Sequence, residues 1–403
     1  MRISTQTFYE QSRTTMGAQQ GSLLRVQQQL GAGTKILTPS DDPLGATRAL
    51  AVSQSIALTA QYSASRSHAV QTLSLEENAL QSVTTVLQNV KSLVIQAGNG
   101  TMADADRASI ATTLQSNLDQ LQGLANTDDG NGQFLFAGFR SASAPFVRQA
   151  YGGIAYTGDQ GQRQVQVDVS RQMAGADDGR SIFQTVQAGA GYVAAAASAN
   201  SGSGVFGATS VVNPSDANYG KDFVISFPAS GSYQVDIVPA SSTPLVASTP
   251  FTPGSPISFG GLQVSISGAP AVGDQVTVAT ARNAGSDVFA AISDVIKALR
   301  TPVDEPKNQA LVLNALSTAN RKLTNAHDNV LTVRSAVGSR LQELDMLSAG
   351  ADDRMLLDKS QLSALQDLDY SSAIGEFYER QTALQASQQT FVKIQKISLF
   401  NYL

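Results

Sequence analysis

The chain has 403 residues, of which 42% are hydrophobic, and this length allows about two to four domains with buried cores. Its 27 basic and 32 acidic residues give a net charge of -5, and no basic run is dense enough to neutralise a row of phosphates, which argues against nucleic acid as a partner. The absence of cysteine excludes disulfides, Cys-ligated metal sites and thiol catalysis.

The first residues, Met1 to Ala18, lack the basic start, the apolar stretch and the cleavage site of a secretory signal. No apolar run approaches the roughly 18 to 20 residues that a membrane-spanning helix needs. On these signals alone, the chain would be classed as soluble and cytoplasmic.

Each end of the chain carries an apolar row with seven-residue spacing. The N-terminal row is formed by Tyr9, Met16, Leu23, Val26 and Leu30. The C-terminal row is formed by Phe377, Leu384 and Phe391 and is widened by Ile374 and Ile394. Such a row predicts a helix that needs a partner for its apolar side. We therefore expect the two terminal helices to pair and to form an assembly seam.

A break follows the first helix. The segment Thr38-Pro39-Ser40-Asp41-Asp42-Pro43 places Asp42 to cap a second helix and Pro43 at its first position. This helix is predicted to run toward Gly98, and its seven-residue repeat is Leu73, Leu80, Leu87 and Val94, with Val83 and Val90 at the alternate positions. Another helix is predicted over Asp104 to Asn126, and a third repeat is formed by Leu316, Leu323, Val330, Val337 and Leu344. Three helices with matching rows predict a bundle.

The middle of the chain has a different texture, because Gly and Pro are frequent and the helical repeat fades. The predicted strands are Gln164 to Val169, Phe223 to Phe227, Tyr233 to Val238, Leu262 to Ile266 and Gln275 to Ala279. The low-complexity segment Ala194 to Gly204 is predicted to be a mobile loop or linker.

The predicted fold is mainly α with an inserted β-rich domain, in which both chain ends build a long, coiled-coil-like helical bundle. Residues 1–40 and 365–403 are expected to be terminal helices that are disordered in the monomer and order on assembly. Residues 41–140 and 285–364 are expected to form the bundle. Residues 141–284 are expected to form a β-rich outer domain.

This pattern resembles the flagellin and hook-associated protein superfamily. The resemblance becomes specific at Gln27 to Leu50, where the Thr38 to Pro43 element has the form typical of the hook-associated protein 3 (FlgL) type rather than of flagellin. It is joined by Asp128 to Phe139, which is similar to the family's hairpin, by Tyr156 to Val169 and by the ending Lys396 to Leu403. Much of the middle departs from the family pattern.

The resemblance implies a non-enzymatic, self-assembling structural subunit that joins hook-associated protein 1 to the flagellin filament as a ring at the hook–filament junction. It also implies that the chain is exported unfolded through the flagellar type III channel without a cleaved signal, with a dedicated export chaperone as a partner. The protein would then be extracellular, as part of the bacterial flagellum that drives motility. Neither nucleic acid nor a membrane is implied as a partner.

Three alternatives remain open at this point. The chain could be a flagellin that polymerises into the filament, although its Thr38 to Pro43 element and its ending argue against this. It could be a cytoplasmic coiled-coil scaffold, although that would not explain the β-rich insertion. An enzyme or adhesin carried by the β-rich domain is the third alternative.

No constellation of residues predicts catalysis, a cofactor or a metal. His68 and His327, the two histidines, are predicted to lie on helices without clustered carboxylates. The pairs Asp41/Asp42, Asp128/Asp129 and Asp352/Asp353 could suggest acid–base or calcium chemistry, but each is predicted beside a helix end or turn, where capping explains it. Gly158-Asp159-Gln160-Gly161 is predicted to be a hairpin turn.

Overall fold

The computed structural model describes residues 5–150, 152–239 and 243–396, and the chain divides into two compact units. One unit contains Met1–Ala64 and Met346–Leu403, and the other contains Ser65–Asp345. Helices α2 (Pro43–Ala97) and α6 (Pro306–Gln366) contribute residues to both units.

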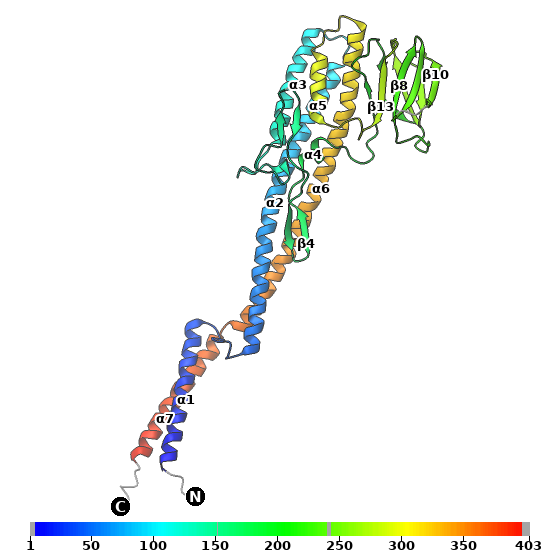
Figure 1. The fold of residues 1–403 in the computed structure, drawn as a ribbon. Coiled ribbons are helices and arrows are strands. Elements are labelled where there is room, and N and C mark those ends of the chain that lie inside the picture. Colours follow the sequence, from blue (N-terminus) through cyan, green and yellow to red (C-terminus); the bar gives the residue numbers. More distant parts are fainter. Residues whose placement is uncertain (1–4, 151, 240–242, 397–403) are drawn as a thin grey trace, which may run out of the picture. The chain divides into compact units, whose positions relative to one another are not determined.

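In the first unit, α1 (Thr5–Ala32) and α7 (Tyr370–Lys396) lie side by side (Figure 1). They are antiparallel, because Tyr9 near the start of α1 contacts Phe391 near the end of α7. At the opposite end, Thr34 forms an isolated β-bridge with Asp367. The pairing of the two chain ends that the sequence predicts is therefore present in the structure.

The second unit contains a bundle in which α3 (Asp104–Ala125) and α5 (Val288–Leu299) lie beside α2 and α6 (Figure 1). The predicted repeats of α2 and α6 are fully buried: Leu73, Leu80, Leu87 and Val94 on α2, and Leu316, Leu323, Val330, Val337 and Leu344 on α6. The bundle has one helix more than the sequence predicts. The additional helix, α5, is only 12 residues long, but Val288 and Val295 lie seven residues apart within it, and this apolar spacing is the signal that could have revealed it.

Helix α6 continues far beyond its predicted repeat. Asp352 and Asp353 lie inside it and are exposed, so the prediction that they flank a helix end or turn is wrong. The chain around them, from Ala351 to Lys359, contains neither Gly nor Pro, and nothing there interrupts the helix.

Aromatic side chains join the bundle to the segment that follows α3. Phe183 lies 5.9 Å from Phe136, 5.3 Å from Phe146 and 5.7 Å from Phe289, measured between ring centroids. These four side chains are fully buried. They come from the 3-10 turn η1 (Leu135–Ala137), strand β1 (Phe146–Arg148), the short helix α4 (Gly179–Phe183) and α5. The cluster fixes the start of the β-rich region on the bundle.

Two small antiparallel ribbons follow, in which β1 pairs with β2 (Ile154–Tyr156) and β3 (Gln164–Asp168) pairs with β4 (Arg171–Ala174). Gly158 to Gly161 connects β2 to β3, which do not pair with each other, so the predicted hairpin turn is wrong. Instead, the Asp159 carboxylate accepts hydrogen bonds from the backbone amides of Phe139 and Gly161 at 2.9 and 2.8 Å. This loop therefore docks onto the earlier Phe139 segment.

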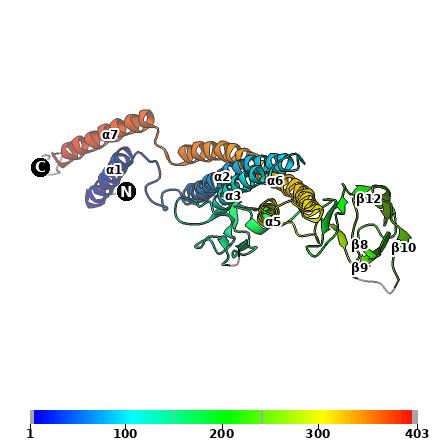
Figure 2. The ribbon, with the colours of Figure 1, turned by 90° about the horizontal axis from the view of Figure 1, so that it is seen from above.

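The remaining strands form a two-layer sandwich (Figure 2). One sheet has the order β10-β9-β8-β13-β5, and in the other β12 pairs with β11, β6 and β7. The strands are β5 (Tyr192–Ala196), β6 (Val205–Phe206), β7 (Ser210–Val211), β8 (Asp222–Ala229), β9 (Ser232–Val238), β10 (Val246–Pro250), β11 (Pro256–Phe259), β12 (Leu262–Ser267) and β13 (Gln275–Thr280). Its core includes Phe223, Ile225, Val235, Ile266 and Val278. All five predicted strands are confirmed, within two residues at either end.

The prediction that Ala194 to Gly204 is a loop or linker is wrong over its first part. Ala194, Ala195 and Ala196 belong to β5 and pair with Val278, Thr277 and Val276 of β13. Alanine has little intrinsic preference for strands, and here the register with β13 decides the conformation. The alanines also allow α6 to approach, since the Thr318 hydroxyl donates to the carbonyl of Ala194 at 2.8 Å.

Candidate assembly surfaces

The predicted assembly seam is mostly brought together between α1 and α7. Val26 is buried at 4% exposure, and the half-buried members are Tyr9, Met16, Leu23, Leu30, Phe377, Leu384 and Phe391. Tyr9 and Phe391 meet edge to face with their ring centroids 5.7 Å apart, a favourable geometry for aromatic rings. Ile374 differs from the others, because it is 45% exposed and Ala373 is buried beside it. The side chain of Ile394 lies outside the described residues.

The α1–α7 interface is thin. Among the side chains described in these two helices, Val26 and Ala373 are the fully buried ones. A helix pair that buries so little apolar area gains little stability by itself.

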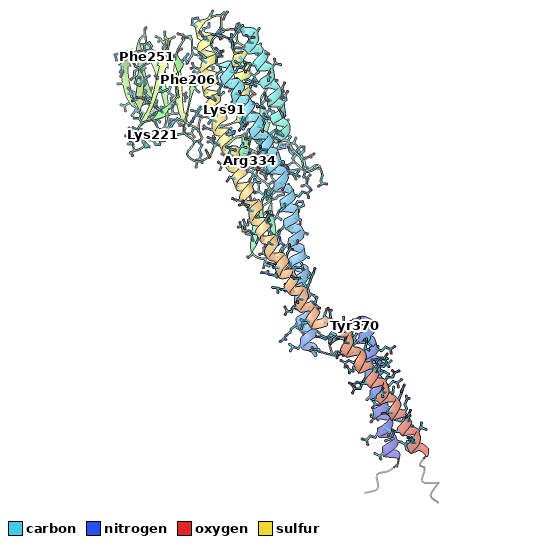
Figure 3. The ribbon with its side chains drawn as sticks, turned by 180° about the vertical axis from the view of Figure 1, so that it is seen from behind. Lys91, Phe206, Lys221, Phe251, Arg334 and Tyr370 are labelled. Atoms are coloured by element: carbon cyan, nitrogen blue, oxygen red, sulfur yellow. The ribbon has the colours of Figure 1, made fainter. Side chains whose placement is uncertain are left out.

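The first unit also exposes many large apolar side chains, although it is the smaller of the two units. They are Leu24, Leu44, Leu50, Leu58, Met346, Leu356, Leu357, Tyr370, Ile374, Tyr378 and Val392. We call this set the outer row. Figure 3 shows one of its members, Tyr370, at the start of α7. Exposed apolar side chains at this density mark a surface that another molecule can cover.

The Thr38 to Pro43 element is held by its two carboxylates. The Asp41 carboxylate accepts from the backbone amides of Thr38 and Leu37 at 3.0 and 3.2 Å and pairs with Arg25 of α1 at 3.0 Å. The amide of Thr38 is the main cause that lowers the pKa of Asp41. Asp42 accepts from the amide of Gly45 at 2.9 Å, and α2 begins at Pro43, so the predicted cap is confirmed. The element thus connects the end of α1 to the start of α2.

The Asp128 and Asp129 carboxylates stabilise a turn by accepting hydrogen bonds from backbone amides. Asp129 accepts from the backbone amides of Asn131 and Gln133 at 2.9 and 3.1 Å, and these bonds lower its pKa. Asp128 accepts from the amide of Gly130 at 3.2 Å. The prediction that this pair lies in a turn is confirmed.

The two histidines stay apart from any carboxylate cluster. His68 is exposed on α2, and the Nε2 of His327 lies 3.4 Å from the side-chain nitrogen of Gln88. Among the described residues, no group of three or more His, Asp or Glu side chains is placed to hold a metal ion. None of the helices in the described part of the chain combines the length and hydrophobicity that crossing a bilayer requires.

A buried charged cluster, which the sequence analysis does not identify, joins the two long helices of the second unit. Glu76 on α2 is fully buried, and its Oε1 accepts from the backbone amide of Asp177 at 3.3 Å. The Asp177 carboxylate in turn forms an ion pair with Arg340 of α6. Burial, and then the nearby Asp177 carboxylate, raise the pKa of Glu76 to about 8.

The sequence holds a signal for this cluster. Glu76 occupies the alternate position of the α2 repeat, equivalent to Val83 and Val90, and Arg340 follows Val337 by three residues on α6. A charged residue at an inward position of a bundle indicates a buried pair. A second ion pair joins Arg334 of α6 to Glu77 of α2 at 2.6 Å. Figure 3 labels Arg334 in the helical part of the second unit.

Comparison with known proteins gives matches over both the whole chain and its first part. The family model of the bacterial flagellin N-terminal helical region matches residues 3–141. Flagellar hook-associated protein 3 of Escherichia coli strain K12 is 32% identical over 401 residues, which cover 99% of each chain.

Solved structures of similar proteins share the fold. The crystal structure of Xanthomonas campestris FlgL is 29% identical and has a TM-score of 0.67, covering 79% of this chain and 99% of that one. The flagellar junction protein FlgL from Legionella pneumophila is 23% identical with a TM-score of 0.66, covering 79% of this chain and 100% of that one.

Proposed function

This chain belongs to the flagellar hook-associated protein 3 family, and we infer from that membership that it is a structural subunit of the hook–filament junction. The observation that carries this inference is the match over the full length of both chains, middle included. The relatives are structural flagellar proteins, and we propose a structural rather than an enzymatic role for this chain as well.

We propose that the protein joins hook-associated protein 1 to the flagellin filament and that copies of it form a ring there. We further propose that it leaves the cell unfolded through the flagellar type III export channel, with a dedicated chaperone as its partner in the cytoplasm. The thin α1–α7 interface supports this route, because little free energy opposes separation of the two helices before export.

The two apolar surfaces of the first unit suggest how assembly proceeds. The buried and half-buried seam, from Tyr9 to Leu30 on α1 and from Phe377 to Phe391 on α7, joins the two ends within one subunit. The outer row, to which Leu24 and Ile374 belong, is then available to neighbouring subunits. On this proposal the terminal helices, residues 1–40 and 365–403, are frayed in the free monomer and become ordered when neighbours cover the outer row.

A filament subunit is the second candidate, because the matching family model is that of the flagellin N-terminal region. That model matches residues 3–141, whereas the hook-associated relative matches the entire chain. Abundance separates the two roles: a filament subunit would dominate sheared flagella, and a junction subunit would be a trace component.

The test is deletion of the gene, followed by electron microscopy of the cells and assay of flagellin in the medium. We expect hooks without filaments and unpolymerised flagellin in the medium. Intact filaments on the deletion strain would overturn the junction role. Absence of flagellin from both the sheared material and the medium would instead establish the second candidate.

A further inference from the structure

A cleft of about 410 Å³ lies between strand β5 and the helices α5 and α6 in the second unit. Its walls are made largely of small side chains: Ala195, Ala196 and Ala197 on one side, and Ala298, Ala310, Ala315 and Ala319 on the other. Such walls let the main chain of a bound molecule come close. The cleft has the size of an ordinary binding pocket for a small ligand or a short peptide segment.

Three lysines from two helices converge on this cleft: Lys297 of α5, and Lys307 and Lys322 of α6. Asp294 is the one acidic side chain that lines it, so the cleft is basic within a chain whose net charge is -5. The site is therefore complementary to a negatively charged molecule.

The three lysines differ in their counter-charges. Lys307 pairs with Glu305 at 2.8 Å, but within the described residues neither Lys297 nor Lys322 forms an ion pair. Lys322 is half-buried, and burial lowers its pKa although Asp294 and Asp287 act in the opposite direction. A half-buried ammonium that forms no ion pair with the carboxylates around it is stabilised when a further carboxylate binds directly beside it.

The cleft also contains the outer edge of a strand. β5 is the edge strand of its sheet, and the amide of Ala197 donates to Gln275 of β13, so the backbone of Ala196 points away from β13. At the preceding outward positions, the carbonyls of Ala194 and Tyr192 accept from Thr318 and Arg321 of α6. Ala196 is the next outward position of β5, and it lines the cleft. An open strand edge of this kind is a template for the main chain of another peptide.

We propose that this cleft binds an acidic, extended peptide segment of a partner protein, with main-chain contact at Ala196 and carboxylates beside Lys297, Lys307 and Lys322. The strand edge distinguishes a peptide from a small anion, because it supplies donors and acceptors that match a main chain. Asn314 also lines the cleft. Its side-chain nitrogen donates to the carbonyl of Gly204 at 2.8 Å, and its side-chain oxygen accepts from the amide of Phe206 at 3.1 Å. Figure 3 shows Phe206 on the side of the sandwich that faces α6. This inference does not depend on the junction role.

The test uses the full chain and two fluorescent peptides, hexaglutamate and hexaglutamine, with binding measured by fluorescence anisotropy. We expect hexaglutamate to bind and hexaglutamine to bind at least about tenfold more weakly. Salt should weaken hexaglutamate binding, because part of the site is open to screening. Carbodiimide cross-linking followed by mass spectrometry should attach the glutamate peptide to Lys297, Lys307 or Lys322.

Substitutions separate this cleft from general charge attraction. The triple variant Lys297→Gln, Lys307→Gln and Lys322→Gln should weaken hexaglutamate binding by about tenfold or more. The matched control replaces three lysines outside the cleft, Lys91→Gln, Lys221→Gln and Lys359→Gln, and should leave binding unchanged. Circular dichroism establishes that both variants are folded.

A proline substitution at Ala196 tests the role of the strand edge. Ala196→Pro removes an outward amide without removing a ladder bond to β13, and it should weaken hexaglutamate binding while Ala196→Ser does not. Absence of binding to the native chain, equal binding of the two peptides, or equal loss in the control triple variant would each overturn the proposal. Cross-links confined to lysines outside the cleft would do the same.

Discussion

Asp42 and Gly45 form a cap at the start of α2 that has no room for a larger side chain. The Asp42 carboxylate accepts from the Gly45 amide at 2.9 Å, and a Cβ added to Gly45 would lie 2.2 Å from the other carboxylate oxygen. Gly45→Ala should therefore displace the cap. We expect the first turn of α2 to lose about 1 kcal/mol of stability in net terms, because the lost cap and the clash outweigh the helix preference of alanine. Hydrogen exchange of the first turn of α2 measures this.

Gly350→Ala is the matched control, because Gly350 lies inside α6 and a Cβ there meets nothing within 4 Å. This variant should slow exchange or leave it unchanged. If Gly45→Ala acts through the cap, the double variant Asp42→Ala, Gly45→Ala should be no less stable than Asp42→Ala alone. Additive costs would show that the clash with Asp42 is not the cause.

Neighbouring leucines on α1 test the two apolar surfaces of the first unit. Leu24 is 51% exposed in the outer row, whereas Leu23 is half-buried in the seam. We expect Leu24→Gln to leave hydrogen exchange of the purified protein unchanged but to reduce filament formation when it replaces the native gene. Leu23→Gln should increase exchange in both α1 and α7, since it weakens the pair by about 1 kcal/mol or more.

The control for this pair is Val272→Gln, an exposed position of the sandwich at 61% exposure. It should change neither exchange nor filament formation. Normal filaments in the Leu24→Gln strain would contradict the role given to the outer row.

Glu76 predicts a pH dependence of stability in the second unit. Its pKa is about 8 in the folded chain and near the ordinary 4.5 when unfolded, so the folded state binds more protons between these values. The free energy of unfolding should therefore fall as the pH rises from about 4.5 to 8, by an amount on the order of 5 kcal/mol. Guanidinium unfolding followed by circular dichroism measures it.

Glu76→Gln removes the ionisable group and keeps the hydrogen bond to the Asp177 amide. Relative to the native chain, this variant should gain stability as the pH rises through that range, and the gain should level off above it. Asn78→Ala, an exposed change on the same helix, should run parallel to the native chain. A Glu76→Gln curve that is also parallel would show that Glu76 does not titrate in this range.

Gly260 is a backbone position that the sandwich core constrains. Its φ is +50°, and a Cβ there would lie 2.3 Å from the ring of the fully buried Phe223. Gly254 also has a positive φ of +80°, but a Cβ there meets nothing within 4 Å. Thermal unfolding should show that Gly260→Ala costs about 1 to 3 kcal/mol more than Gly254→Ala. Equal costs would mean that backbone strain alone matters at Gly260.

The repeating positions of the long helices were predictable because burial there follows directly from the helical period. Leu73 and Val94 are buried in the structure because their seven-residue spacing places them on the same face of the helix. The conformation of Ala196 was not predictable in this way, because alanine carries no strand signal and its place in β5 depends on its pairing with Val276 of β13, far along the chain.

The assembly seam shows the same limit. Seven-residue spacing identifies Phe377, Leu384 and Phe391, which are half-buried, but the widened row includes Ile374, which is 45% exposed. Which side of an apolar helix is covered within the subunit depends on the partner's shape, and the spacing of one helix does not contain that information.

The sandwich enters and leaves the helical part of the chain through one narrow neck. Tyr192 of β5 is paired with Thr280 of β13, and the amide of Ala281 donates to the carbonyl of Gly191 at 2.9 Å. The two ends of the insertion are thus already adjacent, so the insertion closes only a short gap in the helical part of the chain. Helix α6 also contacts the sandwich directly, because Asn314 binds the carbonyl of Gly204 and the amide of Phe206. A foreign domain with adjacent ends could be grafted between Gly191 and Ala281, provided that it supplies partners for the α6 side chains that bind the native sandwich.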